Sequence, residues 1–371
     1  MSQIAIIGGG LAGLAAATDL SLRGFEVVVF EKRKWPSHKV CGEYVSNEVL
    51  PYLNRLGADP LSWGAVAIES FEFSSPNGRY RHTTLPLGGF SISRFALDVH
   101  MAHRAREAGA IIHDHMEITG IENDAQGMTL IAHDGTRHGF DVVLGAFGKR
   151  SKMDKSLERP EFYHRTDYVG LKQYFRGEYP THQVGLYHFG PGYLGISNVE
   201  TGLLNVAVLV RSDALKGGKT PAQLLQEVIA SQPRIHDHLA HATPILDNPL
   251  AISNISFLPR SVVHRGILMM GDAAGMIPPL AGNGMAMAIR AAQLASHEVA
   301  AYLKGQCSRE EMEVRYARGW NDEFQKRLQW GRRLQRIMEH EWACNIGLQL
   351  TRLVPGGLAT IVQQTHGTSH E

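Results

Sequence analysis

Three glycines near the start of the chain, Gly8, Gly10 and Gly13, have the spacing with which a backbone turn holds a diphosphate. Glu31 follows 18 positions after Gly13, and Lys32 stands beside it. A carboxylate at that distance accepts hydrogen bonds from both hydroxyls of an adenosine ribose and repels a 2′-phosphate. These residues therefore predict a binding site for FAD or NAD rather than for NADP.

The chain around these glycines must form a strand, a helix and a second strand for that binding to work. Residues 4–7 are apolar without interruption, as in a strand that is covered on both faces, and residues 27–30 form the second strand. A helix is expected over residues 12–23. Because its first N–H groups point at the phosphates, Leu11 and Ala12 belong to the expected site.

A second glycine-rich segment lies near the other end of the chain. Gly271 and Asp272 end a buried apolar run, and Gly282, Asn283 and Gly284 form a turn before a long helical stretch. The Asp272 carboxylate can accept hydrogen bonds from the hydroxyls of a sugar-like chain. The turn and the helix N-terminus after it face developing negative charge, as at N1 and the C2 carbonyl of a reduced flavin ring.

The two segments together resemble those of the FAD-dependent oxidoreductase superfamily, which contains aromatic-ring hydroxylases (group A flavin monooxygenases), geranylgeranyl reductases and flavin halogenases. In that superfamily the aspartate of the second segment binds the ribityl chain of FAD. The resemblance implies the same role for Asp272, with Gly282, Asn283 and Gly284 lining the isoalloxazine ring. It covers residues 1–305 and narrows the expected cofactor to FAD.

Three further segments match this superfamily, one of them with a substitution. Arg94 opens a helix in the place of an arginine that reaches the phosphate and ribityl part of FAD. Cys41 and Gly42 resemble a loop that passes beside the flavin in geranylgeranyl-reductase-like members. Phe147 stands where the hydroxylases have an aspartate that helps to place FAD and NADPH. This substitution argues against ordinary use of NADPH and leaves the electron donor open between NAD(P)H and a separate reductase.

The order of these segments predicts an α/β fold. We expect a Rossmann-like FAD-binding domain with a parallel sheet and a βαβ unit, an inserted, mostly antiparallel substrate domain, and a C-terminal helical region. The expected ranges are 1–70, 94–155 and 262–304 for the discontinuous FAD-binding domain, 71–93 and 156–261 for the substrate domain, and 305–371 for the helical region.

The residues that contact the substrate are the least defined part of the sequence. In this superfamily the antiparallel sheet forms the floor of a substrate pocket over the flavin, so polar residues in or beside it are the pocket candidates. These are His164, Tyr187, His188 and Tyr193. No spacing marks any of them as acid or base, so the catalytic residues stay unassigned.

The overall composition excludes several classes of function. The formal net charge is +1, and the 37 basic and 36 acidic residues are interspersed, so no basic stripe indicates a nucleic-acid partner. The three cysteines and nineteen histidines lack metal-ligand spacing, so no metal site is expected. No apolar run reaches the length of a transmembrane segment, and the sparse cysteines are typical of a cytoplasmic protein.

Three functions fit this cofactor, each with a small-molecule substrate or partner still to be identified. The first, which we favour, is a monooxygenase of natural-product biosynthesis that oxidises an aromatic or polyketide-like molecule through a flavin C4a-hydroperoxide. The second is a geranylgeranyl-reductase-like reductase or dehydrogenase acting on C=C or C–C bonds. The third is a non-catalytic flavin-binding redox sensor. The Trp-x-Trp-x-Ile-Pro motif of the flavin halogenases is absent from the sequence, which argues against halogenation.

Overall fold

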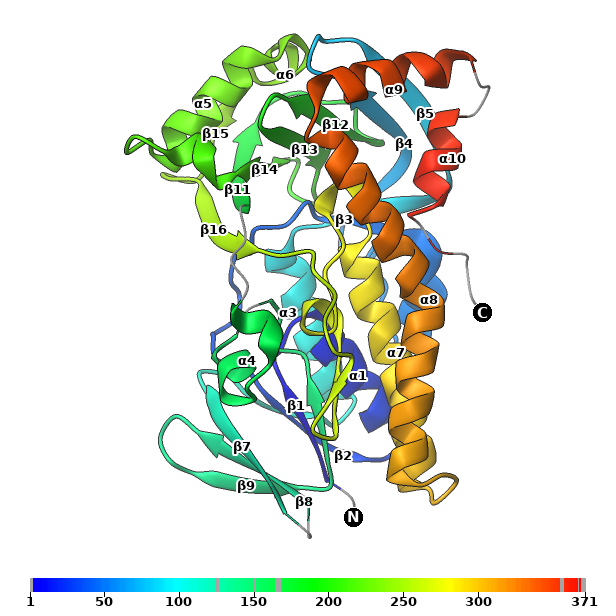
Figure 1. Ribbon diagram of the computed structural model, residues 1–371. Helices are drawn as coiled ribbons and strands as arrows, with labels where there is room; N and C mark the ends of the chain where they lie inside the picture. The colour runs from blue at the N-terminus through cyan, green and yellow to red at the C-terminus, as the bar shows by residue number, and fades with distance from the viewer. Residues whose placement is uncertain are drawn as a thin grey trace.

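The computed structural model describes residues 3–124, 127–149, 151–163, 168–353, 357–365 and 367. A parallel sheet (sheet A) and a larger, mostly antiparallel sheet (sheet B) occupy opposite ends of the molecule, and the long helix α8 (Arg309–Met338) runs along both (Figure 1). This arrangement confirms the expected α/β fold with an inserted antiparallel sheet and a C-terminal helical region.

Sheet A brings together segments that are far apart in the sequence. Its strands, in spatial order, are β17 (Val263–His264), β18 (Ile267–Met269), β10 (Val142–Gly145), β1 (Gln3–Ile7), β2 (Glu26–Phe30) and β6 (Ile111–His113). All neighbours pair in parallel except β17, which is antiparallel to β18. Because parallel strands end at the same edge, the chain segments that follow β1, β2, β10 and β18 meet there.

Helix α1 (Leu11–Leu22) connects β1 to β2 and approaches the sheet very closely. A Cβ on Gly13 would lie 2.0 Å from the carbonyl oxygen of Gly8, so only glycine fits at this crossing. Gly8 makes the turn with φ of +109°, a conformation that favours glycine. Helices α3 (Arg94–Glu107) and α7 (Gly284–Leu303) pack beside α1, and one apolar cluster fills the space between these helices and sheet A.

Smaller elements complete this half of the molecule. They are the antiparallel strands β7 (Ile118–Asp124), β8 (Gly127–Ala132) and β9 (Arg137–Phe140), and the short helices α2 (Leu50–Arg55) and α4 (Lys152–Ser156).

Sheet B forms the other half. Its strands, in spatial order, are β15 (Thr243–Pro244), β11 (Tyr168–Arg176), β14 (Leu204–Arg211), β13 (Gly192–Asn198), β12 (Gln183–Phe189), β4 (Val66–Ser74), β5 (Tyr80–Ser91) and β3 (Tyr44–Ser46), with β16 (Leu250–Ile255) also paired to β11. The expected domain boundary between residues 70 and 71 therefore falls inside β4. One face of sheet B packs on α5 (Pro221–Ser231) and α6 (Pro233–Leu239), and the other faces the half that contains sheet A.

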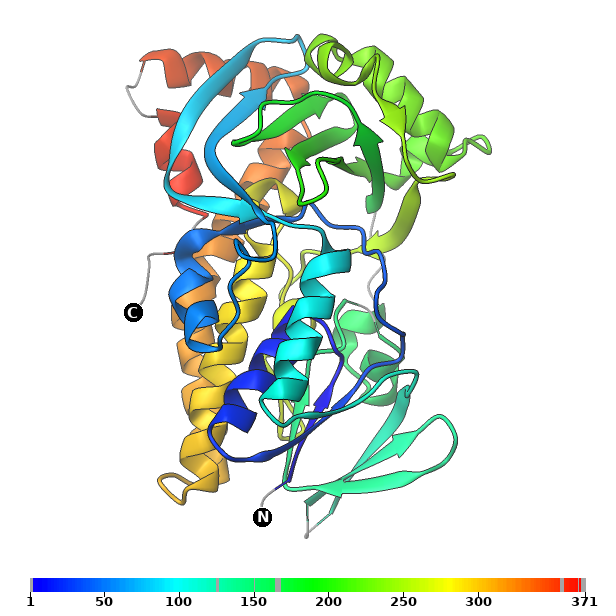
Figure 2. The ribbon, with the colours of Figure 1, turned by 180° about the vertical axis from the view of Figure 1, so that it is seen from behind.

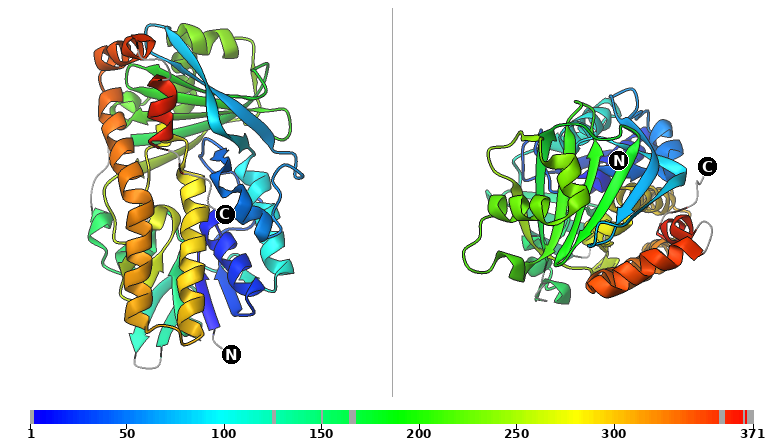
Figure 3. Two further views of the ribbon diagram at one scale, coloured as in Figure 1. Left: turned by 90° about the vertical axis from the view of Figure 1, so that its right-hand side faces the viewer. Right: turned by 90° about the horizontal axis from the view of Figure 1, so that it is seen from above.

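The C-terminal helices connect the two halves. The first part of α8 packs against α7, with Tyr316, Trp320 and Phe324 in the core of the half that contains sheet A. Its last turns, with α9 (Glu341–Leu353), lie against sheet B, and α10 (Gly357–Gln363) contacts β5 (Figure 3). In the part of the chain that the structure describes, every helix is too short or too polar to cross a bilayer.

Candidate functional site

The glycine turn after β1 and the acidic residue after β2 lie together at the carboxyl edge of sheet A. The Gly9 N–H donates to Glu31 Oε2 at 2.7 Å, and the Arg33 N–H donates to Glu31 Oε1 at 2.9 Å. Space is open beside Gly10, because a Cβ there would have only the Arg94 guanidinium within reach, 4.0 Å away. The first N–H groups of α1 border this space, an arrangement that can hold a diphosphate.

The other sequence-predicted residues of this edge are placed close by. Leu11 and Ala12 are buried in the first turn of α1, and Lys32 is exposed directly after Glu31. The structure therefore brings the whole first segment to one edge of the sheet.

Arg94 is fixed beside the glycine turn by a buried carboxylate. Its Nε and Nη2 atoms donate to Asp98 at 2.8 and 3.0 Å, and Lys39 Nζ donates to the same carboxylate at 2.6 Å. Although burial opposes ionisation, the charges of Arg94 and Lys39 hold the pKa of Asp98 below its ordinary value. Asp98 therefore stays charged and keeps the Arg94 guanidinium in place.

Asp272 and Lys149 follow the neighbouring strands β18 and β10 at the same edge, and their charges act on one another. Gly271, with φ of +59°, turns the chain ahead of Asp272. Burial raises the pKa of the Asp272 carboxyl, against the effect of the Lys149 charge. Burial likewise lowers the pKa of the Lys149 amine to about 8, against the effect of Asp272.

Lys149 was not among the sequence-predicted residues. Its Nζ atom is buried and has no hydrogen-bond partner among the residues that the structure describes. A buried amine without a partner is costly, so this position fits an anionic group of a ligand. In the sequence, Lys149 is visible only as a basic residue in the turn after an apolar run. The order β18–β10–β1 in sheet A is what places this turn next to the Asp272 segment.

A buried ionic network supports the Asp272 segment from behind. Arg159 Nη1 donates to Asp154 Oδ1 at 2.9 Å and to the Ala273 carbonyl oxygen at 3.0 Å. Arg260 Nη2 donates to Asp154 at 2.5 Å, and its Nη1 donates to the Asp272 carbonyl oxygen at 3.4 Å. These contacts hold the backbone of the Asp272 segment in place.

The second glycine turn lies between sheet B and the C-terminus of the chain. Gly282 has φ of +64°, and a Cβ there would lie 3.2 Å from the Tyr44 ring. Asn283 is buried and donates through Nδ2 to the Thr365 carbonyl oxygen at 2.8 Å, while Gly284 is exposed at the start of α7. Asn283 therefore anchors the turn, and Gly282 and Gly284 leave its surface bare.

The chain between residues 31 and 43 rises from β2 to sheet B and passes the same space (Figure 2). Asn205 Nδ2 donates to the carbonyl oxygens of Cys41 and Gly42 at 3.3 and 2.9 Å. Gly42 is exposed, and a Cβ there would have no atom within 4 Å. Burial raises the pKa of the Cys41 thiol, which keeps it uncharged and unsuited to be a nucleophile.

A buried polar cluster, made of Glu43, Lys172 and Tyr174, follows this segment. Lys172 Nζ donates to Glu43 Oε1 and, at 2.7 Å, to Tyr174 Oη. Tyr174 Oη donates to Glu43 Oε1 at 2.9 Å, and the Arg94 N–H donates to the same oxygen at 2.6 Å. Burial lowers the pKa of Lys172 and raises that of Glu43, so the two values approach one another. Sequence reasoning missed this cluster, whose only signal was a lysine inside a mostly apolar strand.

A row of residues on the Lys172 side of sheet B forms a floor beside this cluster. Lys172, Ala207, Gly195, Leu186 and Phe73 are neighbours across five adjacent strands. The last four are partly exposed, whereas the residues before and after each of them face the other way and are buried. A Cβ at Gly195 would meet only strand carbonyl oxygens at 3.8 and 3.9 Å. The centre of this face is therefore open.

Two of the four pocket candidates lie on this side of sheet B. Tyr193 accepts a hydrogen bond from the Leu280 N–H at 3.1 Å, and His188 is its register partner. Burial lowers the pKa of His188, which keeps its ring neutral. Tyr187 is adjacent to His188 in β12, so its side chain lies on the opposite face of the sheet, in the apolar cluster away from the floor. His164 lies outside the described residues.

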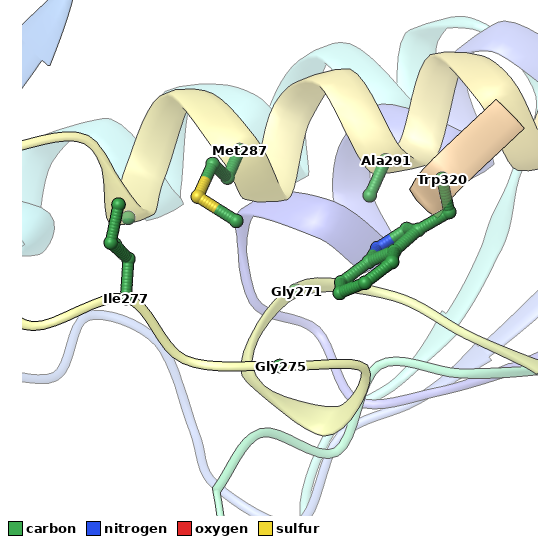
Figure 4. Close-up of a pocket in the computed structure, with 7 residues that line it drawn as sticks. Gly271, Gly275, Ile277, Met287, Ala291 and Trp320 are labelled. Atoms are coloured by element: carbon green, nitrogen blue, oxygen red, sulfur yellow. The ribbon is translucent and has the colours of Figure 1, made fainter. Parts of the chain in front are cut away.

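Neither the small gap beside Gly271 nor any group of metal-binding side chains offers a second site in the described residues. A gap of about 10 Å³ lies between the Asp272 segment, α7 and α8, which is room for about one water molecule (Figure 4). It is lined by Gly271, Gly275, Ile277, Gly284, Met287, Ala291 and Trp320. Within the described ranges, no three His, Cys, Asp or Glu side chains are close enough to hold a metal ion.

The residues at the edge of sheet A fit FAD. The partnerless amine of Lys149 and the guanidinium of Arg94 are suited to phosphates, and the space beside Gly10 admits them closely. Asp272 is suited to ribityl hydroxyls, and the bare surface at Gly42 is suited to a flat ring. Gly271 of the second segment lies beside the first segment, since a Cβ on Gly271 would be 3.3 Å from the Ala12 Cβ.

Comparisons with known proteins agree with this geometry. A family model described as "FAD binding domain" matches residues 1–318. The chain is 24% identical to "Digeranylgeranylglycerophospholipid reductase 2" of Methanopyrus kandleri over 90% of this chain and 86% of that protein. It is 24% identical to "Menaquinone reductase" of Mycobacterium tuberculosis over 80% of this chain and 76% of that protein. A "Tryptophan 2-halogenase" of Chondromyces crocatus is 23% identical over 89% of this chain, which spans 66% of the halogenase.

Solved structures show the same fold at low identity. A geranylgeranyl bacteriochlorophyll reductase-like protein of Thermoplasma acidophilum has a TM-score of 0.80 at 18% identity, over 98% of this chain and 97% of that one. The flavin-dependent brominase Bmp2 has a TM-score of 0.81 at 16% identity, over 98% and 93%.

Proposed function

Since the chain belongs to the FAD binding domain family and is an FAD-dependent oxidoreductase, we propose that it is a monooxygenase acting on an apolar aromatic or polyketide-like small molecule. FAD, when bound, supplies the two-electron chemistry and the reaction with oxygen. The chain's own residues bind the cofactor, position the substrate, exclude water and hold protons.

The observation that carries this proposal is the open floor of sheet B beside the buried Glu43–Lys172–Tyr174 cluster. The floor is apolar, with small residues at Ala207 and Gly195, so it suits a planar and mostly apolar molecule. A substrate that covers this face would also keep water away from a flavin that reacts with oxygen.

The cluster supplies the polar end of this floor. Lys172 is the register neighbour of Ala207, so a hydroxyl group of a substrate at this end of the floor would lie beside the buried cluster. An ammonium there would stabilise the hydroxyl as an oxyanion, which makes an aromatic ring more electron-rich. The hydrogen bonds that link Lys172, Tyr174 and Glu43 would determine whether the Lys172 amine is protonated.

At the other end of the cofactor, we propose that Arg94 and Lys149 hold the diphosphate, with the glycine turn and the N-terminus of α1. Asp272 would hold the ribityl chain, and Glu31 the ribose of the adenosine. We propose that the other sequence-predicted residues contact the cofactor through their backbone or by packing. They are Gly8, Gly10, Leu11, Ala12, Gly13, Lys32, Cys41, Gly42, Gly271, Gly282, Asn283 and Gly284. The electron donor stays open between NAD(P)H and a separate reductase, and a cytoplasmic location is part of this proposal.

A second candidate function is the reduction of a C=C bond. It is favoured by the Cys41–Gly42 loop, which Asn205 holds against the floor, and by the printed names of the reductase relatives. Such a reaction needs a proton donor beside the substrate, and Tyr174 and Lys172 are suited to that role as well.

Turnover of one substrate in ¹⁸O₂ and in the absence of oxygen separates the two functions. For a monooxygenase we expect one ¹⁸O atom in the product and no product without oxygen. A saturated product that forms equally well without oxygen would reject the monooxygenase in favour of the reductase. Parallel reactions with added bromide test the halogenase relatives' chemistry, since a brominated product would reject both candidates.

A further inference from the structure

Helix α9 exposes large apolar side chains in a regular row. Trp342, Ile346 and Leu350 are four residues apart, and 66%, 50% and 56% of their surfaces are exposed. The opposite side of the helix is also apolar, since Cys344 and Leu348 are buried against the protein. A helix with apolar side chains on both sides is not stable at a simple water boundary, so its outer side requires a partner.

The last turns of α8, which lead into α9, also expose large apolar side chains. Trp330 and Ile337 are 37% and 45% exposed, although Trp320, Phe324 and Leu328 on the same helix are buried. Trp330 is two residues beyond Leu328, which places it on a different side of the helix. Trp330, Ile337, Trp342, Ile346 and Leu350 are here named the α8–α9 patch.

The charges around the patch are unequal. Arg333 and Arg336 are exposed, and the Arg333 guanidinium lies 5.7 Å from the centre of the Trp330 ring. The nearby carboxylates Glu339 and Glu341 are exposed too, although Glu339 also accepts a hydrogen bond from Tyr168 of sheet B. Arg332, which is partly exposed, adds a third positive charge. Basic residues therefore outnumber acidic ones along this edge of the patch.

The size and composition of the patch fit a lipid surface better than a second protein. Its five side chains expose on the order of 600 Å², less than the roughly 800 Å² that a stable protein interface buries on each partner. Tryptophan, branched aliphatic residues and flanking arginine are typical of helices that lie at a bilayer surface. We propose that the α8–α9 patch docks on an anionic lipid bilayer, with the apolar side chains between the headgroups and the arginines on lipid phosphates.

The position of α9 gives this docking a consequence. Its inner residue Cys344 and the α8 residue Met338 pack in one cluster with Tyr193 and Leu209 of sheet B, on the side of the open floor. Figure 3 shows α9 along the outer edge of the molecule beside this sheet. A docked enzyme would therefore hold its substrate floor next to the lipid phase. The docking itself does not depend on which oxidation the enzyme performs.

The test is co-sedimentation of the purified full chain with vesicles of phosphatidylcholine, with and without phosphatidylglycerol. We expect the wild-type chain to pellet with the anionic vesicles and its tryptophan emission to shift to shorter wavelength. The double variant Trp342→Glu/Ile346→Glu should lose this binding. The double variant Arg333→Gln/Arg336→Gln should bind anionic vesicles about 10- to 30-fold more weakly and neutral vesicles unchanged, since each arginine contributes roughly fivefold.

Val314→Glu is the matched control, because Val314 is also exposed on α8 but lies at its other end. It should bind as the wild type does. Flavin absorbance and circular dichroism check that each variant is folded. The proposal is overturned if wild-type protein stays in the supernatant with anionic vesicles, or if Trp342→Glu/Ile346→Glu binds normally. It is also overturned if light scattering shows a dimer that this variant dissociates, since the patch would then be an interface between two copies.

Discussion

At the scale of single residues, the edge of sheet A holds the opposite charges of Asp272 and Lys149. Among the residues that the structure describes, Lys149 Nζ has no hydrogen-bond partner, and burial shifts the pKa of each of the two residues toward its uncharged form. Such an arrangement is costly in the free protein and favourable when a ligand supplies the missing hydrogen bonds. It predicts that both residues matter more for cofactor binding than for folding.

The first prediction is that Asp272→Ala removes FAD from the protein. The ribityl hydroxyls lose their carboxylate acceptor, so the variant should purify largely colourless while its circular dichroism stays that of the wild type. Asp134→Ala, in an exposed turn, is the control and should stay yellow. Full flavin absorbance in Asp272→Ala would remove Asp272 from the cofactor site.

The second prediction concerns Lys149 and pH. Loss of a charged hydrogen bond to phosphate in Lys149→Met should weaken FAD binding about 10- to 100-fold near neutral pH. The pKa of Lys149 is about 8 in the free protein, so wild-type affinity should fall roughly tenfold between pH 7 and 9, as the amine loses its proton. The variant should show no such fall.

Binding of riboflavin and ADP to the cofactor-free protein identifies the contact. If Lys149 holds the diphosphate, Lys149→Met weakens ADP and leaves riboflavin unchanged. Equal affinities of variant and wild type for FAD would contradict the assignment. Lys152→Met, whose exposed side chain pairs with Glu117, is the control.

At the scale of elements, sequence reasoning was strongest where a backbone requirement is local. The glycine turn, α1 and the acid after β2 follow one another along the chain, and the structure places them as expected. It was weakest where the result depends on strand register. Tyr187 and His188 are adjacent in sequence but face opposite sides of β12, and only the pairing with β13 and β4 decides which side meets the floor.

The third prediction tests the crossing of α1 over β1. A Cβ at residue 13 would lie 2.0 Å from the Gly8 carbonyl oxygen, so Gly13→Ala must push the helix away from the turn. We expect a loss of about 1–3 kcal/mol in the free energy of unfolding, measured with urea, and weaker FAD binding. Gly347→Ala, in α9 with no atom within 4 Å, should instead gain up to about 1 kcal/mol.

At the scale of the whole molecule, the two halves are joined by a buried ion pair. Glu43 comes from the segment that leaves sheet A, and Lys172 lies in sheet B. Sequence reasoning could not find this pair, because the two residues are separated by most of the first half of the chain. Glu43 and Lys172 meet only when both sheets have formed, whereas the glycine turn forms from consecutive residues.

The fourth prediction is that Lys172→Met destabilises the fold by about 3–5 kcal/mol near neutral pH, because Glu43 is left as an unpaired buried charge. Burial raises the pKa of Glu43, so its neutral form favours the folded state. The variant should therefore be more stable near pH 5 and lose stability as pH rises. Glu43→Gln added to Lys172→Met should restore much of the loss. Additive effects of the two substitutions in urea unfolding would contradict the pairing.

The order of strands in sheet A also has a consequence for how the protein is made on the ribosome. Strand β1 pairs with β2, which follows directly after α1, but its other neighbour β10 and then β18 emerge much later. The edge that holds Asp272 therefore cannot close until the chain has been synthesised past residue 272. Pairing over such long sequence separations is slow and exposes unpaired strands, so free FAD and chaperones should raise the yield of folded protein.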